Sequence, residues 1–266
     1  MIAEAKEWTE RAIAMNREWK NQFDRDGFVV IPRFFDPDEI KELEAGLARF
    51  LRDVAPQASK AEVMYEDPAN PASLKQANCL QREPSFHELM HATGKVRGLA
   101  ELLIGPAAPQ QCEYFGKPPG HSTPTPPHQD GFYFCLEPNL ACTLWVPLDV
   151  VDADNGALSY VRGSHRLGVL PHRVTSVLGF SQGLVPDPAE LGEAVLCAAR
   201  PGDILVHHSL TIHYAGSNRS ERHRRSIGCV FFSEAAKPDE PARARYQAAL
   251  QGQHEAKGIV ARAVSP

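Results

Sequence analysis

The sequence lacks any long apolar run, and no stretch approaches the roughly 20 consecutive apolar residues that a membrane-spanning helix needs. Residues 1–7, MIAEAKE, also lack the apolar core of a secretory signal peptide. These absences argue against a membrane-spanning or a secreted protein. We therefore expect a cytoplasmic protein without a membrane partner.

A basic surface and paired cysteines are missing as well. The net charge is -5, with acidic and basic residues interspersed, so no basic face is available for nucleic acid or an acidic membrane surface. The absence of a C-x-x-C pair argues against a zinc ribbon or a disulfide framework. We expect small buried side chains in a reducing compartment at the six cysteines, Cys79, Cys112, Cys135, Cys142, Cys197 and Cys229.

What is present fits one large globular domain. The chain has 266 residues, of which 43% are hydrophobic, and this is enough for a large core. We expect a single domain over residues 1–266, with helices over about 1–105, a β-rich core over about 106–233 and a C-terminal tail over 234–266. The sequence does not specify an oligomeric state.

The N-terminal part carries helix signals around one short strand. Residues 2–21 are polar and helix-prone, and residues 27–32 form a β-rich run between turn residues. Asp36 then suits an N-cap, with Pro37 at the first helical position and Glu39 three residues after the cap. One apolar stripe follows at helical spacing: Ile40, Leu43, Leu47, Phe50 and Leu51.

The character of the chain changes from helical to β-rich after Gly105. Residues 54–78 indicate a long irregular connection, and residues 85–103 a helical region broken by Gly94 and Gly98. Short β-rich runs between turn residues then predict a β-sandwich or barrel. These runs are residues 111–115, 131–136, 140–148, 157–161, 194–198, 203–208 and 225–232.

A first candidate site is the H-x-D pair formed by His128 and Asp130. Side chains at i and i+2 of an extended segment leave the same face, so both could bind one ion. Together with a second histidine they would supply the three protein ligands of a non-haem iron centre. The proline-rich residues 117–127 lead into the pair, and their fixed φ angles would hold the loop in place.

Two further candidates lie near the C-terminal end of the β-rich part. Three histidines, His207, His208 and His213, follow a Pro-Gly turn, and spacing alone does not choose a third ligand among them. If a strand begins near Arg224, alternation places Arg224 and Ser226 on one face. An inward arginine in an apolar barrel is costly unless it meets an anion, and a carboxylate would satisfy it through two hydrogen bonds.

An ordered set of motifs runs through the chain: residues 128–130 (HQD), 145–149 (WVPLD), 154–158 (DNGAL), 163–165 (GSH) and 201–203 (PGD), then His213 and Arg224. This set resembles the phytanoyl-CoA dioxygenase family of iron(II)- and 2-oxoglutarate-dependent oxygenases. The resemblance extends from Gly27 to about Phe232. It implies a double-stranded β-helix, a jelly-roll barrel that is mainly β with flanking N-terminal helices.

The resemblance also assigns roles to residues. The family's second histidine lies five residues after another strand histidine and eleven before an arginine, a spacing met by His208, His213 and Arg224. His213 is thus the implied third ligand and His208 a group supporting the ligands. Arg224 is the implied partner of the distal carboxylate of 2-oxoglutarate.

Further residues are implied to face the cosubstrate. They are Trp145 beside it, Lys75 and Gln111 by comparison with relatives, and Thr143 because it shares a strand face with Trp145.

Two positions depart from the family pattern. Ala215 replaces a serine of some members, and Glu113 stands where the mammalian proteins have methionine. Alternation leaves open whether Glu113 points inward, where it could select a polar or cationic substrate, or outward.

The implied chemistry explains these residue types. Two imidazoles and a carboxylate occupy one face of iron(II) and leave positions for 2-oxoglutarate and O2. Decarboxylation of 2-oxoglutarate to succinate and CO2 is coupled to oxidation of a substrate C–H bond, usually to a hydroxyl. Asp130 favours a hydroxylase, because related halogenases carry a small residue at that position.

The expected substrate is a small polar molecule or a natural-product intermediate, because no basic groove is present for the phosphates of CoA. Residues 54–78 and 177–183 are the expected covers of the site, since long loops often carry function. Two alternatives remain: a cupin-type metalloenzyme that does not use 2-oxoglutarate, and a non-catalytic jelly-roll binding module.

Overall fold

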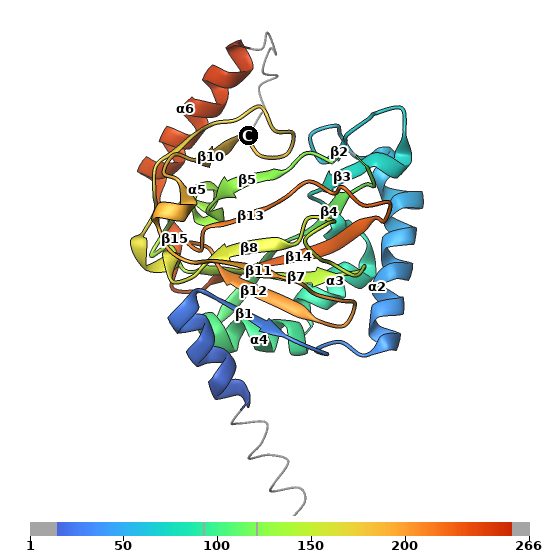
Figure 1. Ribbon diagram of the computed structural model, residues 1–266, viewed down its shortest axis with the longest axis horizontal. Helices are drawn as coiled ribbons and strands as arrows, with labels where there is room; N and C mark the ends of the chain where they lie inside the picture. The colour runs from blue at the N-terminus through green and yellow to red at the C-terminus, as the bar shows by residue number, and fades with distance from the viewer. Residues whose placement is uncertain (1–14, 93, 121, 257–266) are drawn as a thin grey trace, which may run out of the picture.

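Two antiparallel sheets form the body of the protein (Figure 1). The computed structural model describes residues 15–92, 94–120 and 122–256. The larger sheet contains, in spatial order, β1 (Phe28–Ile31), β12 (Ile204–His208), β7 (Ala141–Pro147), β14 (Arg224–Ser233), β4 (Ala107–Lys117), β3 (Leu74–Ala77) and β2 (Val63–Tyr65). The smaller contains β11 (Ala194–Cys197), β8 (Leu158–Val161), β13 (His213–Ala215) and β5 (Thr125–His128).

Two short ribbons complete the strands. They are the pair β10 (Gln182–Leu184) and β9 (His172–Val174), and the pair β15 (Lys237–Pro238) and β6 (Leu136–Glu137). The π-helix η1 (Phe50–Val54) and five 3-10 turns lie between the longer elements: η2 (Ala55–Gln57), η3 (Pro71–Ser73), η4 (Leu80–Arg82), η5 (Ser164–Leu167) and η6 (Pro188–Glu190).

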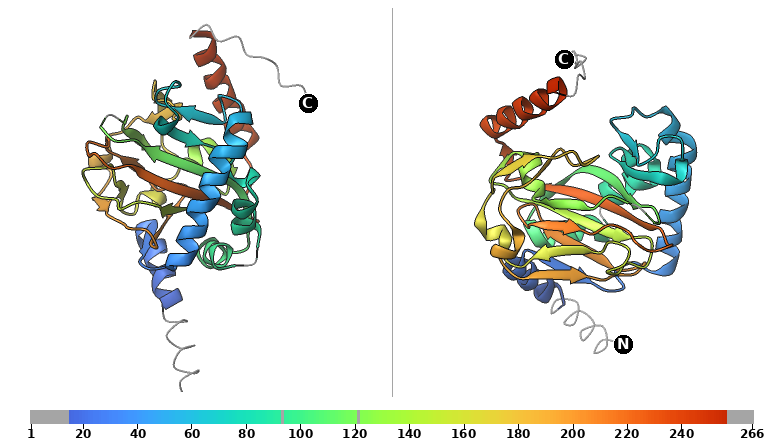
Figure 2. Two further views of the ribbon diagram at one scale, coloured as in Figure 1. Left: turned by 90° about the vertical axis from the view of Figure 1, so that its right-hand side faces the viewer. Right: turned by 45° about the horizontal axis from the view of Figure 1, so that its top comes forward.

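The main hydrophobic core lies between the seven-stranded sheet and three helices, α2 (Pro37–Arg49), α3 (Pro84–His91) and α4 (Lys95–Ile104). Residues 15–26 are also helical. Two further helices, α5 (Asp130–Phe134) and α6 (Glu240–Ala256), lie away from this core. Figure 2 shows α6 on the opposite side of the sheets from α2. None of the helices in the described part of the chain is long and apolar enough to cross a membrane.

Helix α2 begins as its sequence predicts. The Asp36 side chain accepts hydrogen bonds from the backbone N–H groups of Asp38 and Glu39, and Glu39 accepts one from the Asp36 N–H at 2.7 Å. This capping box satisfies N–H groups that have no partner within the helix. The apolar stripe ends at Phe50, and Leu51 is 40% exposed because the chain passes into the π-helix η1, whose wider turn breaks the helical spacing.

A second, smaller core lies between the two sheets. It joins Phe28, Trp145 and Leu205 of the larger sheet to Leu158 and Tyr160 of the smaller one. This core is small because part of the space between the sheets is a cavity, lined by both polar and apolar side chains.

Several expected boundaries were wrong. Residues 54–78 are not an irregular connection, since β2 and β3 extend the larger sheet. Gly98 does not break α4, although Gly94 does precede its first turn. Residues 131–136 are mostly the short helix α5 rather than a strand. The expected tail over residues 234–266 contains the helix α6. The helix expected over residues 2–21 is present where the structure describes it, at residues 15–21, and its first part lies outside the described residues.

Candidate metal centre and active site

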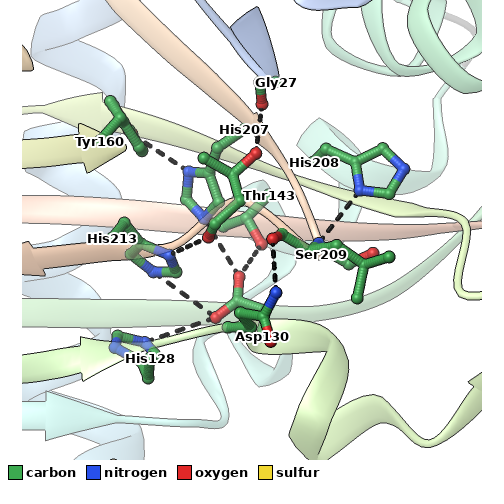
Figure 3. Close-up of polar contacts among 12 residues, drawn as sticks. Gly27, His128, Asp130, Thr143, Tyr160, His207, His208, Ser209 and His213 are labelled. Carbon is green, nitrogen blue, oxygen red and sulfur yellow. Dashed lines mark hydrogen bonds and ion pairs between the residues drawn. The ribbon is translucent and has the colours of Figure 1, made fainter. Parts of the chain in front are cut away.

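The three predicted metal ligands lie together between the sheets (Figure 3). His128 ends β5, Asp130 begins α5, and His213 begins β13. In the β5–β13 pairing, His128 lies directly opposite His213. One ligand atom from each of the three residues lies within 4.8 Å of the others. The H-x-D spacing predicts that both side chains can bind one ion. They are placed to do so, although only His128 belongs to a strand and Asp130 already begins a helix.

The hydrogen bonds of both histidines leave the correct nitrogen available. Nδ1 of His128 lies 2.8 Å from the carbonyl oxygen of Pro126, and Nδ1 of His213 lies 3.0 Å from that of Thr211. A carbonyl oxygen only accepts, so each Nδ1 carries the proton and each Nε2 keeps its lone pair. Both Nε2 atoms lie 3.6 Å from Oδ1 of Asp130, so the three form a donor set for one cation.

The other oxygen of Asp130 is held by two neighbours. The Thr143 hydroxyl donates to Oδ2 at 2.7 Å, and Nε2 of His207 lies 3.1 Å from the same atom. The Tyr160 hydroxyl lies 3.1 Å from Nδ1 of His207, which completes a chain from Tyr160 through His207 to Asp130. These contacts turn Oδ1 toward the histidines.

The sequence-based expectation for His208 was wrong, because His207 takes the supporting position. Neighbouring residues of a strand point to opposite faces. The ring of His208 therefore lies beside Phe23 and His165, with centroids 6.0 and 5.5 Å away, on the side of β12 away from Asp130.

The site's electrostatics suit a metal ion. Burial lowers the pKa of His213 well below its usual value, so the imidazole is neutral, as a ligand must be. Burial opposes ionisation of Asp130, but the surrounding polar groups, among them the His207 N–H that donates to Oδ2, outweigh it and hold the pKa of Asp130 well below its usual value. The site therefore presents a carboxylate and neutral nitrogen donors.

A cavity of about 660 Å³ opens beside the three residues. Arg224, Trp145, Thr143 and Gln111 line it, as the sequence predicts of residues facing a cosubstrate. Residues 175–181 form part of the wall, so most of the expected cover at 177–183 does lie at the cavity. From the expected cover at 54–78 the wall takes Ala61, Met64, Gln76 and Asn78.

The surroundings of Arg224 suit the binding of an anion. It is 3% exposed, its Nη1 donates to Ser226 Oγ at 3.2 Å, and its buried Nε has no hydrogen-bond partner among the described residues. The guanidinium carbon lies 5.6 Å from the centre of the Trp145 ring. Burial lowers the pKa of Arg224 to about 10, so the group is still a cation at neutral pH. A buried cation with an unpaired donor matches a carboxylate ligand.

Lys75 lies behind the cavity wall rather than on it. Its Nζ lies 3.2 Å from Glu66 Oε1 and donates to the Thr123 hydroxyl, and Lys75 does not belong to the described cavity lining. Its role toward the cosubstrate stays a prediction. Lys117 is also buried, where desolvation and the charge of Arg224 lower its pKa to about 6.

Glu113, whose direction alternation left open, points inward and lines the cavity. It is 9% exposed. Burial, reinforced by the charge of Asp130, raises its pKa to about 7.

Other lining residues escaped the sequence reasoning. Alternation along β12 could have found His207, because the sides to which the neighbouring residues point fix the side to which His207 points. Tyr133, Tyr246 and Leu250 had no such signal, because they come from a short helix and the supposed tail.

A family model described as phytanoyl-CoA dioxygenase (PhyH) matches residues 23–226. The chain belongs to the phytanoyl-CoA dioxygenase family. The expected family of iron(II)- and 2-oxoglutarate-dependent oxygenases is therefore confirmed, and so is the mainly β fold with helices. The donor set of His128, Asp130 and His213 agrees with the family's metal requirement.

Curated relatives and solved structures agree with this family. Peroxisomal phytanoyl-CoA dioxygenase of Rattus norvegicus is 25% identical over 240 residues, which cover 84% of this chain and 70% of the relative. The α-ketoglutarate-dependent epimerase SnoN from nogalamycin biosynthesis is 26% identical, with a TM-score of 0.67 over 85% of this chain and 86% of SnoN. The carbocyclase SnoK, 23% identical with a TM-score of 0.63 over 83% of this chain and 85% of SnoK, shares the fold.

Proposed function

We propose that this protein is a non-haem iron(II)- and 2-oxoglutarate-dependent dioxygenase that oxidises an unactivated C–H bond of a small polar molecule or natural-product intermediate, with release of succinate and CO2. The observation that carries the proposal is the donor set of His128, Asp130 and His213 beside a buried arginine with an unpaired donor. SnoN has been crystallised with Fe3+, α-ketoglutarate and nogalamycin RO, which supports both cofactors and a natural-product substrate.

Each residue has a distinct part in this chemistry. Nε2 of His128, Nε2 of His213 and Oδ1 of Asp130 would hold iron(II), which supplies the activation of O2 coupled to decarboxylation of 2-oxoglutarate. Arg224 would bind and orient the distal carboxylate, with Trp145 packed against the guanidinium. Thr143 and His207 keep the Asp130 carboxylate ionised and oriented.

Asp130 supports oxidation rather than halogenation, because a carboxylate here takes the coordination position that a halide would need. Asp130 does not decide which oxidation takes place. The similar solved structures include an epimerase and a carbocyclase. The proposed reaction class therefore includes reactions other than hydroxylation, which is its simplest member.

The test is a set of thermal melts and a succinate assay. We expect iron(II) to raise the melting temperature, 2-oxoglutarate to raise it further, and both together to release succinate under air. His128→Ala should abolish both increments, whereas Arg224→Ala should keep the metal increment and lose the one from 2-oxoglutarate. A metal increment with no response to 2-oxoglutarate would instead indicate a cupin-type enzyme, and no metal increment a binding module.

A further inference from the structure

One part of the cavity wall gathers hydrogen-bond acceptors. It consists of Glu113 on β4, Gln76 on β3 and Asn78 just after β3, all of which line the cavity. Glu113 is 9% exposed and Gln76 is 6% exposed. We refer to these three residues as the acceptor wall. None of these three residues has a role in the oxidation proposed above.

The charge of Glu113 has no protein counterion. No Lys, Arg or His in the described part of the chain forms an ion pair with it, and its hydrogen bonds come from the neutral amides of Gln111 and Gln76. The charge of Asp130, which acts on Glu113, is of the same sign. A buried carboxylate without a cation is costly, and a cationic ligand in the cavity would offset that cost.

Two carbonyl oxygens beside it are also unsatisfied. Oε1 of Gln76 and Oδ1 of Asn78 are buried and have no hydrogen-bond partner among the described residues. Because the Gln76 amide donates its N–H group to Glu113, its oxygen is left free to accept. Gly179, with φ +83°, makes room for that oxygen, since a Cβ at this position would overlap it.

We propose that the acceptor wall binds a protonated amino group, so that the substrate is an organic amine. The proposal deepens the proposed function and rests on it. An ammonium group has three N–H donors and a positive charge, which match a carboxylate and two carbonyl oxygens. A hydroxyl group has one donor and no charge, and it would leave the Glu113 carboxylate without a cation. A carboxylate would be repelled.

The remaining lining residues define the body of the amine. Besides Trp145, five Phe and Tyr side chains line the same cavity: Phe115, Tyr133, Phe134, Phe180 and Tyr246. Such surfaces bind a hydrocarbon or aromatic body through apolar contact.

Within the larger sheet, Glu113 lies apart from Arg224 and Trp145. In the larger sheet, Gly228 pairs with Glu113 on one side and with Trp145 on the other. Gly228 has no side chain, and a Cβ there would lie 3.0 Å from the Phe115 ring. Glu113 on β4 thus lies one strand from β14, which carries Arg224, and two strands from β7, which carries Trp145. Gln111, one of the residues expected to face the cosubstrate, also lies on β4 and hydrogen-bonds to Glu113.

Calorimetry with matched probes tests this inference. The protein is loaded with Mn(II) and 2-oxoglutarate at pH 8 and titrated with ω-phenylalkylamines of two to six methylenes and with the corresponding alcohols. We expect the best amine to bind at least about tenfold more tightly than its alcohol. Glu113→Gln should remove this preference and leave alcohol affinity within about threefold. Glu190→Gln, which removes an exposed charge, is the control for net charge and should keep the preference.

The outcomes separate the inference from the proposed function. Equal affinity for amine and alcohol, no binding of any amine in the series, or equal weakening of both probes by Glu113→Gln would overturn the inference. Titration of 2-oxoglutarate alone is measured first on the Mn(II) form. If 2-oxoglutarate does not bind, the proposed function fails, whereas binding of 2-oxoglutarate without an amine preference overturns the inference only.

Discussion

At the scale of single residues, His207 is the side chain that orients the metal-binding carboxylate without touching the proposed metal position. Its two nitrogens are both engaged, one with Asp130 and one with Tyr160. Since Nε2 must donate to the carboxylate, Nδ1 accepts from the tyrosine hydroxyl. The ring is therefore a rigid link between the core and the site.

We expect His207→Ala to weaken Mn(II) affinity by about ten- to a hundredfold, because loss of a partner that orients a ligand commonly has this effect. Calorimetric titration measures it. His207→Gln, which keeps a donor, should recover part of the loss. His208→Gln serves as the control on the opposite face and should leave affinity close to that of the unaltered protein. Unchanged affinity in His207→Ala would contradict the orienting role.

Glu113 gives the metal-free protein a defined pH dependence. Its pKa is raised from 4.5 to about 7 by burial, so the folded state holds the proton more tightly than the unfolded state. Below pH 4.5 the group is neutral in both states and costs nothing. As pH rises through 7, stability on the order of 3 kcal/mol is lost, at 1.36 kcal/mol per pKa unit.

Glu113→Gln should therefore be more stable than the unaltered protein at pH 8, by up to about 3 kcal/mol, and equal to it near pH 4.5. Urea unfolding of both proteins across this range measures the difference. A difference that does not change with pH would show that Glu113 titrates near its ordinary value.

At the scale of elements, short segments decide the site and were the hardest to predict. The H-x-D pattern pointed to His128, and the family resemblance selected His213. The strands that carry them, β5 and β13, are only four and three residues long. A period of two needs more residues than this to be visible. The aromatic residues in 131–136 predicted a strand. The chain instead forms the short helix α5 there, and Asp130 is its first residue.

Longer elements were predicted more accurately for the same reason. The capping box and apolar stripe of α2, and the β-rich runs that form β7 and β14, extend over many residues, most of which are buried in the strands. The strand β3 escaped because its inward residue Gln76 faces the cavity, so polar residues replaced the apolar alternation. Apolar sequence patterns identify strands and helices that pack against the core. They fail for a strand that faces a cavity instead of the core.

Helix α6 closes one side of the cavity through Tyr246. Its ring lies 6.1 Å from that of Phe132 and 5.8 Å from that of Tyr133, and its hydroxyl lies 3.3 Å from that of Ser181. We expect Tyr246→Ala to increase amide hydrogen exchange in residues 175–182, because this wall loses its packing, while the metal and 2-oxoglutarate increments in melting temperature persist. Tyr246→Phe, which keeps the ring, should have a smaller effect. Unchanged exchange would show that α6 does not support the loop.

At the scale of the whole molecule, stability and chemistry lie on opposite faces of one sheet. The large core fills the side covered by α2, α3 and α4, whereas the side facing the smaller sheet holds the cavity. A strand points alternate residues to the two sides, so each of β4, β7 and β14 contributes to both. The core on the helical side of the sheet can therefore stabilise the fold whichever side chains line the cavity on the other side.

Phe86 on α3 tests this division. It is fully buried in the large core. We expect Phe86→Ala to lower the free energy of unfolding by about 3–5 kcal/mol but to change Mn(II) and 2-oxoglutarate affinities by less than about threefold. Denaturant unfolding and calorimetry measure the two quantities. A parallel fall in metal affinity would show that the two faces are coupled.

The pairing of β5 with β13 has a consequence for the protein without its metal. β5 is the outermost strand of the smaller sheet and includes Pro126 and Pro127, which have no N–H group to donate. Because His128 lies opposite His213 in this pairing, a cation bound by both would tie the edge strand to its neighbour. Loss of the cation should let the edge fray, but its prolines make it a poor template for adding strands from other molecules. Iron starvation would then leave a soluble pool of protein that can be reloaded rather than an aggregate.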